Sequence, residues 1–333
     1  MSKAFPQLAF YAVISLVVLA SPWIVPSIVT QMAFLWLMIV FALTWDIMGG
    51  QMGYNSFGNI LFFGVGAYVC AVVQRDSGLH YFSALAAGAV LAAIAAAIVA
   101  AILGPAVLAL RGHYFAIATL GMGIAAADIA AGWHYIGGAS GIVTPLFPGA
   151  VQGRGRFFCY LLFLVAAFTF FTLRWLYRTR FGIAINAIRD DEEKAEAMGI
   201  RTTRYKTAAW CISAFFLGLA GAVAGNLVGF IDPHEFAFAG TTYGVWMILM
   251  AMLGGRGTLW GPVIGALVFH VTQELLWTYL LGWQRVAMGL FIVLVVVFFP
   301  NGIVGSFRQS WTQPAGDKAG DLTPYEPTSQ AVD

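Results

Sequence analysis

Long apolar runs alternate with short polar segments along almost the whole chain. A bilayer core of about 30 Å is crossed by about 20 apolar residues in a helix. Runs of about this length can be placed at 8–29, 31–48, 57–73, 81–103, 113–131, 157–176, 205–230, 241–253, 259–280 and 285–299. This pattern predicts an all-α, polytopic integral membrane helical bundle with about ten transmembrane helices, and the count depends on the third and eighth runs.

One long polar segment, residues 174–206, interrupts the apolar pattern. It holds eight of the 17 lysine and arginine residues, namely Arg174, Arg178, Arg180, Arg189, Lys194, Arg201, Arg204 and Lys206. Because basic loops stay on the cytoplasmic side, this segment predicts a cytoplasmic loop, and ten spans then place both termini in the cytoplasm. Within it, apolar residues at helical spacing predict one or two short amphipathic helices, either a solvated connector or a docking element for a soluble partner.

Composition agrees with a membrane protein. The 333 residues are 60% hydrophobic and only 10% charged, whereas a soluble domain carries about 25% charged residues. A net charge of +2, with its basic residues clustered in one loop, gives no indication of nucleic-acid binding. The three cysteines lie in apolar runs, so no disulfide framework is expected. We expect a transmembrane permease domain at 1–308, with its cytoplasmic loop at 177–204, and a disordered cytoplasmic tail at 309–333.

Glycine clusters mark the candidate substrate path. Residues 49–58 and 254–265 are rich in glycine, interrupt apolar runs and include Asn55, Ser56 and Pro262, with Asn59 next to the first cluster. Broken or re-entrant helices at membrane depth are tolerated where they are buried in protein or line a wet cavity. A Gly- and Pro-rich loop at 132–155 is expected to cover the outer mouth. Arg154 and Arg156 are expected to belong to this outer loop.

Groups that supply energy or catalysis are scarce in the sequence. Few carboxylates fall inside the spans, and those that do lie near span ends: Asp46, Asp128 and Glu274. Because an ion-coupled carrier normally buries such groups along its route, the sequence disfavours coupling to an ion gradient. The five histidines lack metal-ligand spacing, and no phosphate-binding loop or catalytic constellation occurs. We therefore expect no enzyme activity and no metal or cofactor bound by this chain. Energy would then arrive from a partner at the cytoplasmic loop, and the alternative is a self-sufficient secondary transporter or channel for a small polar solute.

Several separated blocks resemble one family. They are 43–59, 110–120, 137–142, 180–182 with 187–192, 253–262 and 299–303. In this order and spacing the chain is similar to the permease subunits of branched-chain amino acid ABC importers, in the LivM-like branch. Asn59 departs from the family pattern. Glu193, Ala195 and Gly199 are similar to the Glu-Ala-Ala-x-x-x-Gly coupling motif, but the Leu-Pro that follows it in the family is absent.

The resemblance implies a complex in a bacterial or archaeal cytoplasmic (inner) membrane. Its other members would be a related LivH-like permease, two cytoplasmic ATPases that hold ATP and Mg, and an extracytoplasmic solute-binding protein, all surrounded by membrane lipid. The implied solute is a branched-chain or other hydrophobic amino acid. Urea, short amides and aromatic acids are alternative solutes that the sequence does not distinguish from amino acids.

The resemblance also assigns residues to roles. Coupling to the ATPase is expected at Arg180, Gly182, Arg189, Asp190, Glu192, Glu193, Ala195 and Gly199. Apolar Ile185, Ile188 and Met198 would fill a groove on the ATPase, with Arg189, Asp190, Glu192 and Glu193 at its rim. The translocation pathway is expected at Gly53, Asn55, Ser56, Phe57, Gly58, Asn59, Tyr114, Phe115 and Thr119.

Overall fold

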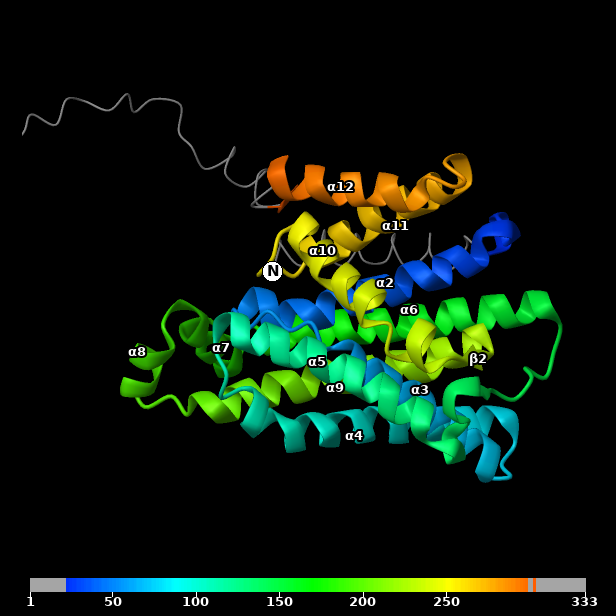
Figure 1. Cartoon of the computed structure of the whole chain (residues 1–333), viewed down its shortest axis with the longest axis horizontal. Helices are drawn as coiled ribbons and strands as arrows, with labels where there is room; N and C mark the ends of the chain where they lie inside the picture. The colour runs from blue at the N-terminus through cyan, green and yellow to red at the C-terminus, as the bar shows by residue number, and fades with distance from the viewer. Residues whose placement is uncertain (1–21, 299–301, 304–333) are drawn as a thin grey trace, which may run out of the picture.

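The computed structural model describes residues 22–298 and 302–303 and is built almost entirely of helices (Figure 1). The α-helices are α2 (Val29–Asp46), α3 (Ile60–Asp76), α4 (Tyr81–Val107), α5 (Gly112–Gly132), α6 (Val151–Leu176), α7 (Arg180–Asp190), α8 (Glu192–Ala197), α9 (Thr202–Val228), α10 (Val245–Gly254), α11 (Gly261–Tyr279) and α12 (Gln284–Phe298). The predicted run at 8–29 falls mostly outside the described residues, as does the predicted tail at 309–333. The other nine predicted runs coincide with helices.

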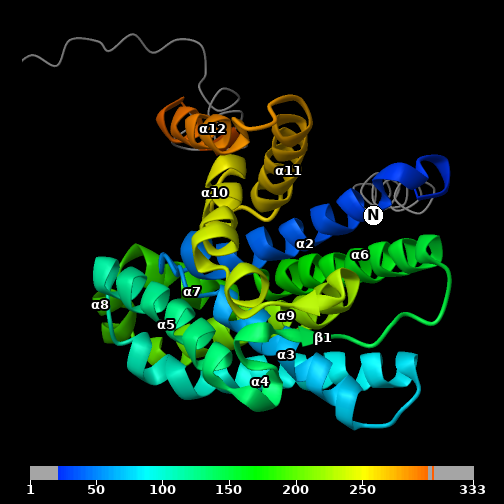
Figure 2. The ribbon, with the colours of Figure 1, turned by 45° about the vertical axis from the view of Figure 1, so that its right-hand side comes forward.

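Helix α9 is the centre of the bundle and packs against α3, α4 and α6. Glycines permit this close approach, because a Cβ on Gly221 would lie 2.1 Å from the Phe63 carbonyl oxygen, and one on Gly218 would lie 2.6 Å from the Ala96 Cβ. Small residues at helix interfaces let backbones pack closely where lipid supplies no hydrophobic driving force. Helices α2 and α6 lie between this layer and α10 to α12, which form the other side of the molecule (Figure 2).

Six helical stretches in the described part of the chain are long and apolar enough to cross a membrane. They are Pro26–Gln51, Tyr81–Val107, Gly112–Gly132, Gly153–Leu176, Thr202–Val228 and Pro233–Gly254. Helices α3 and α12 are shorter, and α3 ends with the charged pair Arg75 and Asp76. The all-α membrane bundle is therefore confirmed, whereas the count of about ten spans stays a prediction.

Two of the departures from regular α-helix were predicted from the glycine clusters, and a further one precedes α10. Helix α2 ends in a π-helical turn, η2 (Ile47–Gln51), before an irregular segment that reaches α3. A short turn separates α10 from α11, so both predicted interruptions are real. Two further π-helical turns, η5 (Pro233–Ala237) and η6 (Gly240–Gly244), precede α10. The sequence did not predict them: the apolar run at 241–253 predicts a transmembrane helix where most of η6 lies, and η5 lies before that run.

The predicted outer loop is more ordered than its composition indicates. It holds two short 3-10 turns, η3 (His134–Ile136) and η4 (Gly138–Ser140), and strand β1 (Ile142–Val143), which pairs antiparallel with β2 (Phe230–Ile231). The expectation that Arg154 and Arg156 lie in this loop is wrong, because α6 already begins at Val151. The Arg154 guanidinium donates hydrogen bonds to the carbonyl oxygens of Asn226 (3.1 Å) and Leu227 (2.7 Å). These contacts satisfy carbonyls at the end of α9.

Candidate functional site

Helices α7 and α8 form the predicted cytoplasmic element and lie at the end of the bundle opposite the two-stranded sheet (Figure 1). Each helix begins at a side-chain cap. The hydroxyl of Thr179 accepts a hydrogen bond from the Phe181 N–H, and the carboxylate of Asp191 accepts one from the Lys194 N–H at 3.0 Å. An N-cap side chain satisfies a backbone donor that the helix leaves free, and two glutamates in the first turn of α8 suit its positive end. Two short helices are therefore confirmed.

The apolar face of these helices packs within the chain. The side chains of Ile185, Ile188 and Ala195 are buried. The expectation that Ile185 and Ile188 fill a groove on an ATPase is therefore wrong, because both side chains pack inside the chain's own helical bundle. Met198 is 84% exposed and Ile183 is also exposed, so these two present apolar surface outward.

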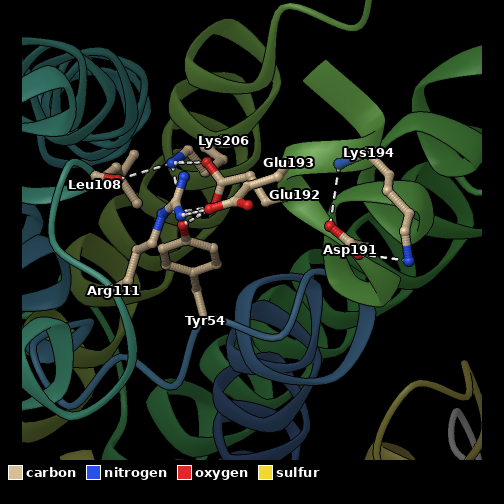
Figure 3. A network of polar contacts seen from close by, with 8 residues as sticks. All are labelled: Tyr54, Leu108, Arg111, Asp191, Glu192, Glu193, Lys194 and Lys206. Carbon is tan, nitrogen blue, oxygen red and sulfur yellow. Dashed lines mark hydrogen bonds and ion pairs between the residues drawn. The ribbon is translucent and has the colours of Figure 1, made fainter. Parts of the chain in front are cut away.

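Lys206 anchors the base of α9 to this element. Its side chain is only 5% exposed, and its ammonium donates to three oxygens: Glu192 Oε1 at 2.7 Å, the Leu108 carbonyl at 2.9 Å and the Tyr54 hydroxyl at 3.0 Å (Figure 3). A lysine has three donors, so every one of them is satisfied. Burying a charge that has all its hydrogen-bond partners costs far less free energy than burying an unpaired charge.

Glu192 joins three elements of the chain. Besides Lys206 on α9, its carboxylate accepts a hydrogen bond from the Tyr54 hydroxyl at 2.5 Å, and Arg111 lies 3.5 Å away just before α5 (Figure 3). Burial alone would raise the pKa of Glu192, but the hydrogen bonds from Lys206 and Tyr54 outweigh it and lower the pKa below the ordinary glutamate value. Burial raises the pKa of Tyr54, and its hydrogen bond to Glu192 raises it further. The phenol therefore stays protonated as a donor.

The expected rim position of Glu192 is wrong, because its side chain is only 12% exposed. Glu193 does lie at the surface, with its side chain 82% exposed and its carboxylate 3.2 Å from Arg111. The two neighbouring glutamates therefore differ in role. Glu192 holds α8 to the bundle, and Glu193 faces outward.

A cavity of about 300 Å³ opens beside this network. Its wall includes Gly53, Asn55, Phe57 and Phe115, which are four of the predicted pathway residues, together with Glu192. Polar groups and aromatic faces thus share one concave surface. Helix α8 contributes part of that surface through Glu192.

The remaining predicted pathway residues do not share one environment. Ser56, Gly58, Asn59 and Thr119 are buried, whereas Tyr114 is exposed. The Thr119 hydroxyl accepts a hydrogen bond from the Phe57 N–H at 3.1 Å, and a Cβ on Gly58 would lie 2.2 Å from the Thr119 carbonyl oxygen. These contacts join the segment after α2 to α5. The assignment of these residues to a pathway stays a prediction.

Asn59 belongs to a buried polar cluster with α9. Its amide oxygen accepts a hydrogen bond from the Trp210 indole N–H at 3.3 Å, and its amide nitrogen lies 3.5 Å from the Ser213 hydroxyl. Ser213 in turn donates to the Thr44 carbonyl at 2.8 Å. Asn59, which precedes α3, is therefore joined to α9 directly and to α2 through Ser213.

The two glycine-rich interruptions pack directly against each other. The Asp46 carboxylate accepts a hydrogen bond from the Gly257 N–H at 2.7 Å, and the Gln51 amide donates to the Gly257 carbonyl at 2.9 Å. A Cβ on Gly50 would lie 1.9 Å from Asp46 Oδ1 and 2.5 Å from the Gly257 nitrogen. Only glycine fits at position 50, because the second interruption approaches so closely.

Arg189, at the end of α7, lies where both interruptions meet. A Cβ on Gly53, whose φ is +81°, would lie 3.2 Å from Arg189 Cγ, and one on Gly257 would lie 3.6 Å from an Arg189 guanidinium nitrogen. The guanidinium itself is paired with Asp190 at 3.0 Å. Of the other predicted coupling residues, Gly182 and Ala195 are buried, Arg180 is exposed, and Gly199 has a φ of +87°. Their role in coupling stays a prediction.

Sequence reasoning missed the importance of Tyr54, Arg111 and Lys206. Lys206 counted only as a basic residue of the loop, although it lies inside the apolar run at 205–230. An ionisable residue in a membrane helix needs a named partner. That signal could have drawn attention to Lys206, but nothing in the sequence identifies Tyr54, 152 positions away, as one of its partners.

Comparison with known proteins places the chain in a family. Residues 27–299 match the family described as "Branched-chain amino acid transport system / permease component". The chain is 27% identical to the high-affinity branched-chain amino acid transport system permease protein LivM of Salmonella typhimurium, and the match covers 85% of this chain and 71% of the relative. It is 28% identical to the LivM protein of Escherichia coli K12, and that match covers 81% of this chain and 68% of the relative. LivH of Salmonella typhimurium is 31% identical over a shorter stretch, covering 38% of this chain and 40% of the relative.

No solved structure matches the chain. The family match covers most of the residues that build the bundle, including η2, the cavity wall and the Glu192 network. Together with its six apolar helices, this match makes the chain a multi-pass membrane protein. The chain belongs to the family of branched-chain amino acid transport permease components.

Proposed function

We propose that this chain is the LivM-like subunit of an ATP-binding cassette importer and forms half of a pore for branched-chain or other hydrophobic amino acids. A LivH-like permease would form the other half, two ATPases would supply the energy, and an extracytoplasmic binding protein would deliver the solute. The chain itself would be non-catalytic. It would cross the cytoplasmic membrane about ten times with both termini inside.

The Glu192 network is the observation that carries this proposal. An ATPase that moves α8 would act on Glu192, which is hydrogen bonded to both Tyr54, in the segment after α2, and Lys206 at the base of α9. Because Glu192 also borders the 300 Å³ cavity, motion of α8 would reshape the wall that contains predicted pathway residues. Energetic coupling between distant sites requires an element with two arrangements whose equilibrium both sites bias, and the contacts of Glu192 would supply such a bias.

The position of Arg189 also supports transmission of motion from α7 and α8 to the glycine-rich interruptions. It lies at the end of α7 and against both glycine-rich interruptions, so a displacement of α7 would reach them without an intervening element. We assign docking to exposed groups of this loop, with Glu193 as the first candidate. Arg180, Gly182, Asp190, Ala195 and Gly199 would shape or flank the docking surface.

Reconstitution tests the proposal. The full chain, its LivH-like partner, both ATPases and the binding protein are placed in proteoliposomes, and uptake of labelled leucine and ATP hydrolysis are measured together. We expect uptake to require every subunit, and Glu193→Arg to leave the protein inserted while ATP hydrolysis loses its link to uptake. Uptake by the chain alone would instead establish a self-sufficient transporter or channel, and normal coupling in Glu193→Arg would place docking elsewhere.

A further inference from the structure

A second cavity, separate from the predicted pathway, lies along the first turns of α9. It has a volume of about 580 Å³ and runs from Arg201, which precedes α9, to Ala208. At 1.5 Å per residue this distance corresponds to about 10 Å along the helix. Since α9 begins at Thr202 and its apolar run begins at residue 205, the cavity extends from the polar start of α9 to the first residues of the apolar run.

Two arginines give this cavity its charge. Arg201 and Arg204 line it, both are exposed, and neither side chain forms a hydrogen bond or ion pair with any residue in the described part of the chain. Three other basic residues of the same polar segment, Lys194, Arg189 and Lys206, are each paired with a carboxylate. The two guanidinium groups therefore have donors free for an anion from outside the chain.

The other walls are mainly apolar. Phe181 and Tyr205 form one side, with ring centroids 5.8 Å apart, and Met198 and Ala208 add aliphatic surface. A small soluble anion would leave this surface uncovered. A ligand with an acidic head and an apolar chain covers both parts, as basic pockets between membrane helices do with anionic lipids.

We propose that this cavity binds the headgroup of an anionic phospholipid in the cytoplasmic leaflet, with the phosphate on Arg201 and Arg204 and the first part of an acyl chain along Phe181 and Ala208. Placing this end of α9 in the cytoplasmic leaflet rests on the proposed orientation. Lipid binding itself can be measured without transport. Failure of the two proposals is therefore distinguishable.

The cavity also contains Gly199, a predicted coupling residue, so an ATPase side chain is the competing occupant. A lipid held there would touch Met198 just beyond α8 and would make the position of the coupling element sensitive to lipid composition. The charge and the apolar wall favour the lipid, because Arg201 and Arg204 lie at the start of α9 beside the apolar side chains that line the same cavity.

Native mass spectrometry of the full purified chain tests this site. Phosphatidylglycerol and phosphatidylcholine with the same acyl chains are added in turn, to the unmodified chain and to Arg201→Gln/Arg204→Gln. We expect selective retention of phosphatidylglycerol and at least about tenfold weaker binding in the double variant, because each basic side chain near an anionic lipid surface contributes on the order of a fivefold change. Both arginines are exposed, and a melting measurement checks that the variant is folded.

Arg178→Gln/Lys194→Gln is the matched control. It removes two positive charges from the same polar segment without altering the cavity wall, and its phosphatidylglycerol affinity should stay within about twofold of the unmodified chain. Equal retention of the two lipids, or equal loss in both double variants, would overturn the proposal. So would displacement of phosphatidylglycerol by inorganic phosphate alone, which indicates a simple anion site, or by added ATPase subunit, which indicates a protein interface.

Discussion

The interruption after α2 and the interruption between α10 and α11 lie against each other, yet different kinds of contact hold them. The first, residues 47–59, is held by side chains, since Tyr54 binds Glu192, the Trp45 indole N–H donates to the Ser56 carbonyl at 2.7 Å, and the Phe57 N–H reaches Thr119. The second combines close backbone packing within itself with hydrogen bonds between Gly257 and the side chains of Asp46 and Gln51. A Cβ on Gly254 would lie 1.7 Å from the Gly261 carbonyl oxygen.

This difference indicates how the two interruptions would move. The first is hydrogen bonded to the predicted coupling element and borders a cavity, so it can change position when Glu192 changes partner. The second has backbone packed on backbone and is hydrogen bonded to Asp46 and Gln51, so it is expected to follow the first as a rigid neighbour. Side-chain changes should therefore damage coupling at the first interruption, and added bulk should damage folding at the second.

The largest effect is expected at Glu192. Glu192→Ala leaves the Lys206 ammonium buried without a counter-charge, which should lower the free energy of unfolding by about 3 kcal/mol and reduce coupled uptake at least about tenfold. Chemical denaturation in micelles and leucine uptake measure the two effects. Glu193→Ala is the matched control for stability, since this exposed side chain should contribute less than about 1 kcal/mol. Equal losses in both variants would contradict the separate roles of the two glutamates.

Added bulk at the second interruption should have the next largest effect. Gly254→Ala forces α10 and α11 apart, because the new Cβ would overlap the Gly261 carbonyl, and should destabilise the chain by about 2 kcal/mol. Thermal melting in micelles checks this. Gly121→Ala is the control, because a Cβ there would meet no atom within 4 Å apart from its chain neighbours and its own helix backbone. A melting temperature unchanged in Gly254→Ala would show that the second interruption is loosely packed.

A milder change separates coupling from folding at the first interruption. Tyr54→Phe removes the hydroxyl between Glu192 and Lys206 but keeps the ring, whose centroid lies 5.2 Å from that of Phe115. We expect a loss of about 1 kcal/mol in stability, with a larger fall in uptake per ATP hydrolysed. Uptake and hydrolysis are measured on the same proteoliposomes. Unchanged uptake per ATP would remove Tyr54 from the transmission route.

The smallest effect is a pH dependence. The folded chain holds the pKa of Glu192 below its unfolded value, so this group adds stability above the ordinary glutamate pKa and loses it as pH falls through the lowered pKa. Melting temperatures should therefore fall more between pH 6 and pH 3, a range chosen about the ordinary carboxyl pKa, for the unmodified chain than for Glu192→Gln. Parallel pH profiles would show that Glu192 is not held ionised by Lys206 and Tyr54.

The sequence predicted the helices well because each apolar run carries its own signal. Nine of the predicted runs became helices, and both glycine-rich interruptions lie where the clusters predicted. The π-helical turns at Pro233–Ala237 and Gly240–Gly244 were missed, because a π-helical turn depends on packing rather than on a periodic pattern.

The site was predictable only in part. The polar segment and its two short helices followed from charge and spacing, but the distinction between buried Glu192 and exposed Glu193 did not. That distinction depends on Lys206 and Tyr54, and the Tyr54 hydroxyl comes from a residue 138 positions before Glu192. Adjacent identical side chains acquire opposite roles only once the tertiary fold exists.

A spin label on exposed Asn55 tests most directly whether α8 acts on the first interruption through Glu192. The label is attached to Asn55→Cys in a chain whose three native cysteines are replaced, assembled with its ATPases, and its mobility is recorded with and without ATP. We predict an ATP-dependent change in mobility that disappears in Glu192→Ala and weakens in Tyr54→Phe while ATP hydrolysis continues. An unchanged response in both variants would contradict the account.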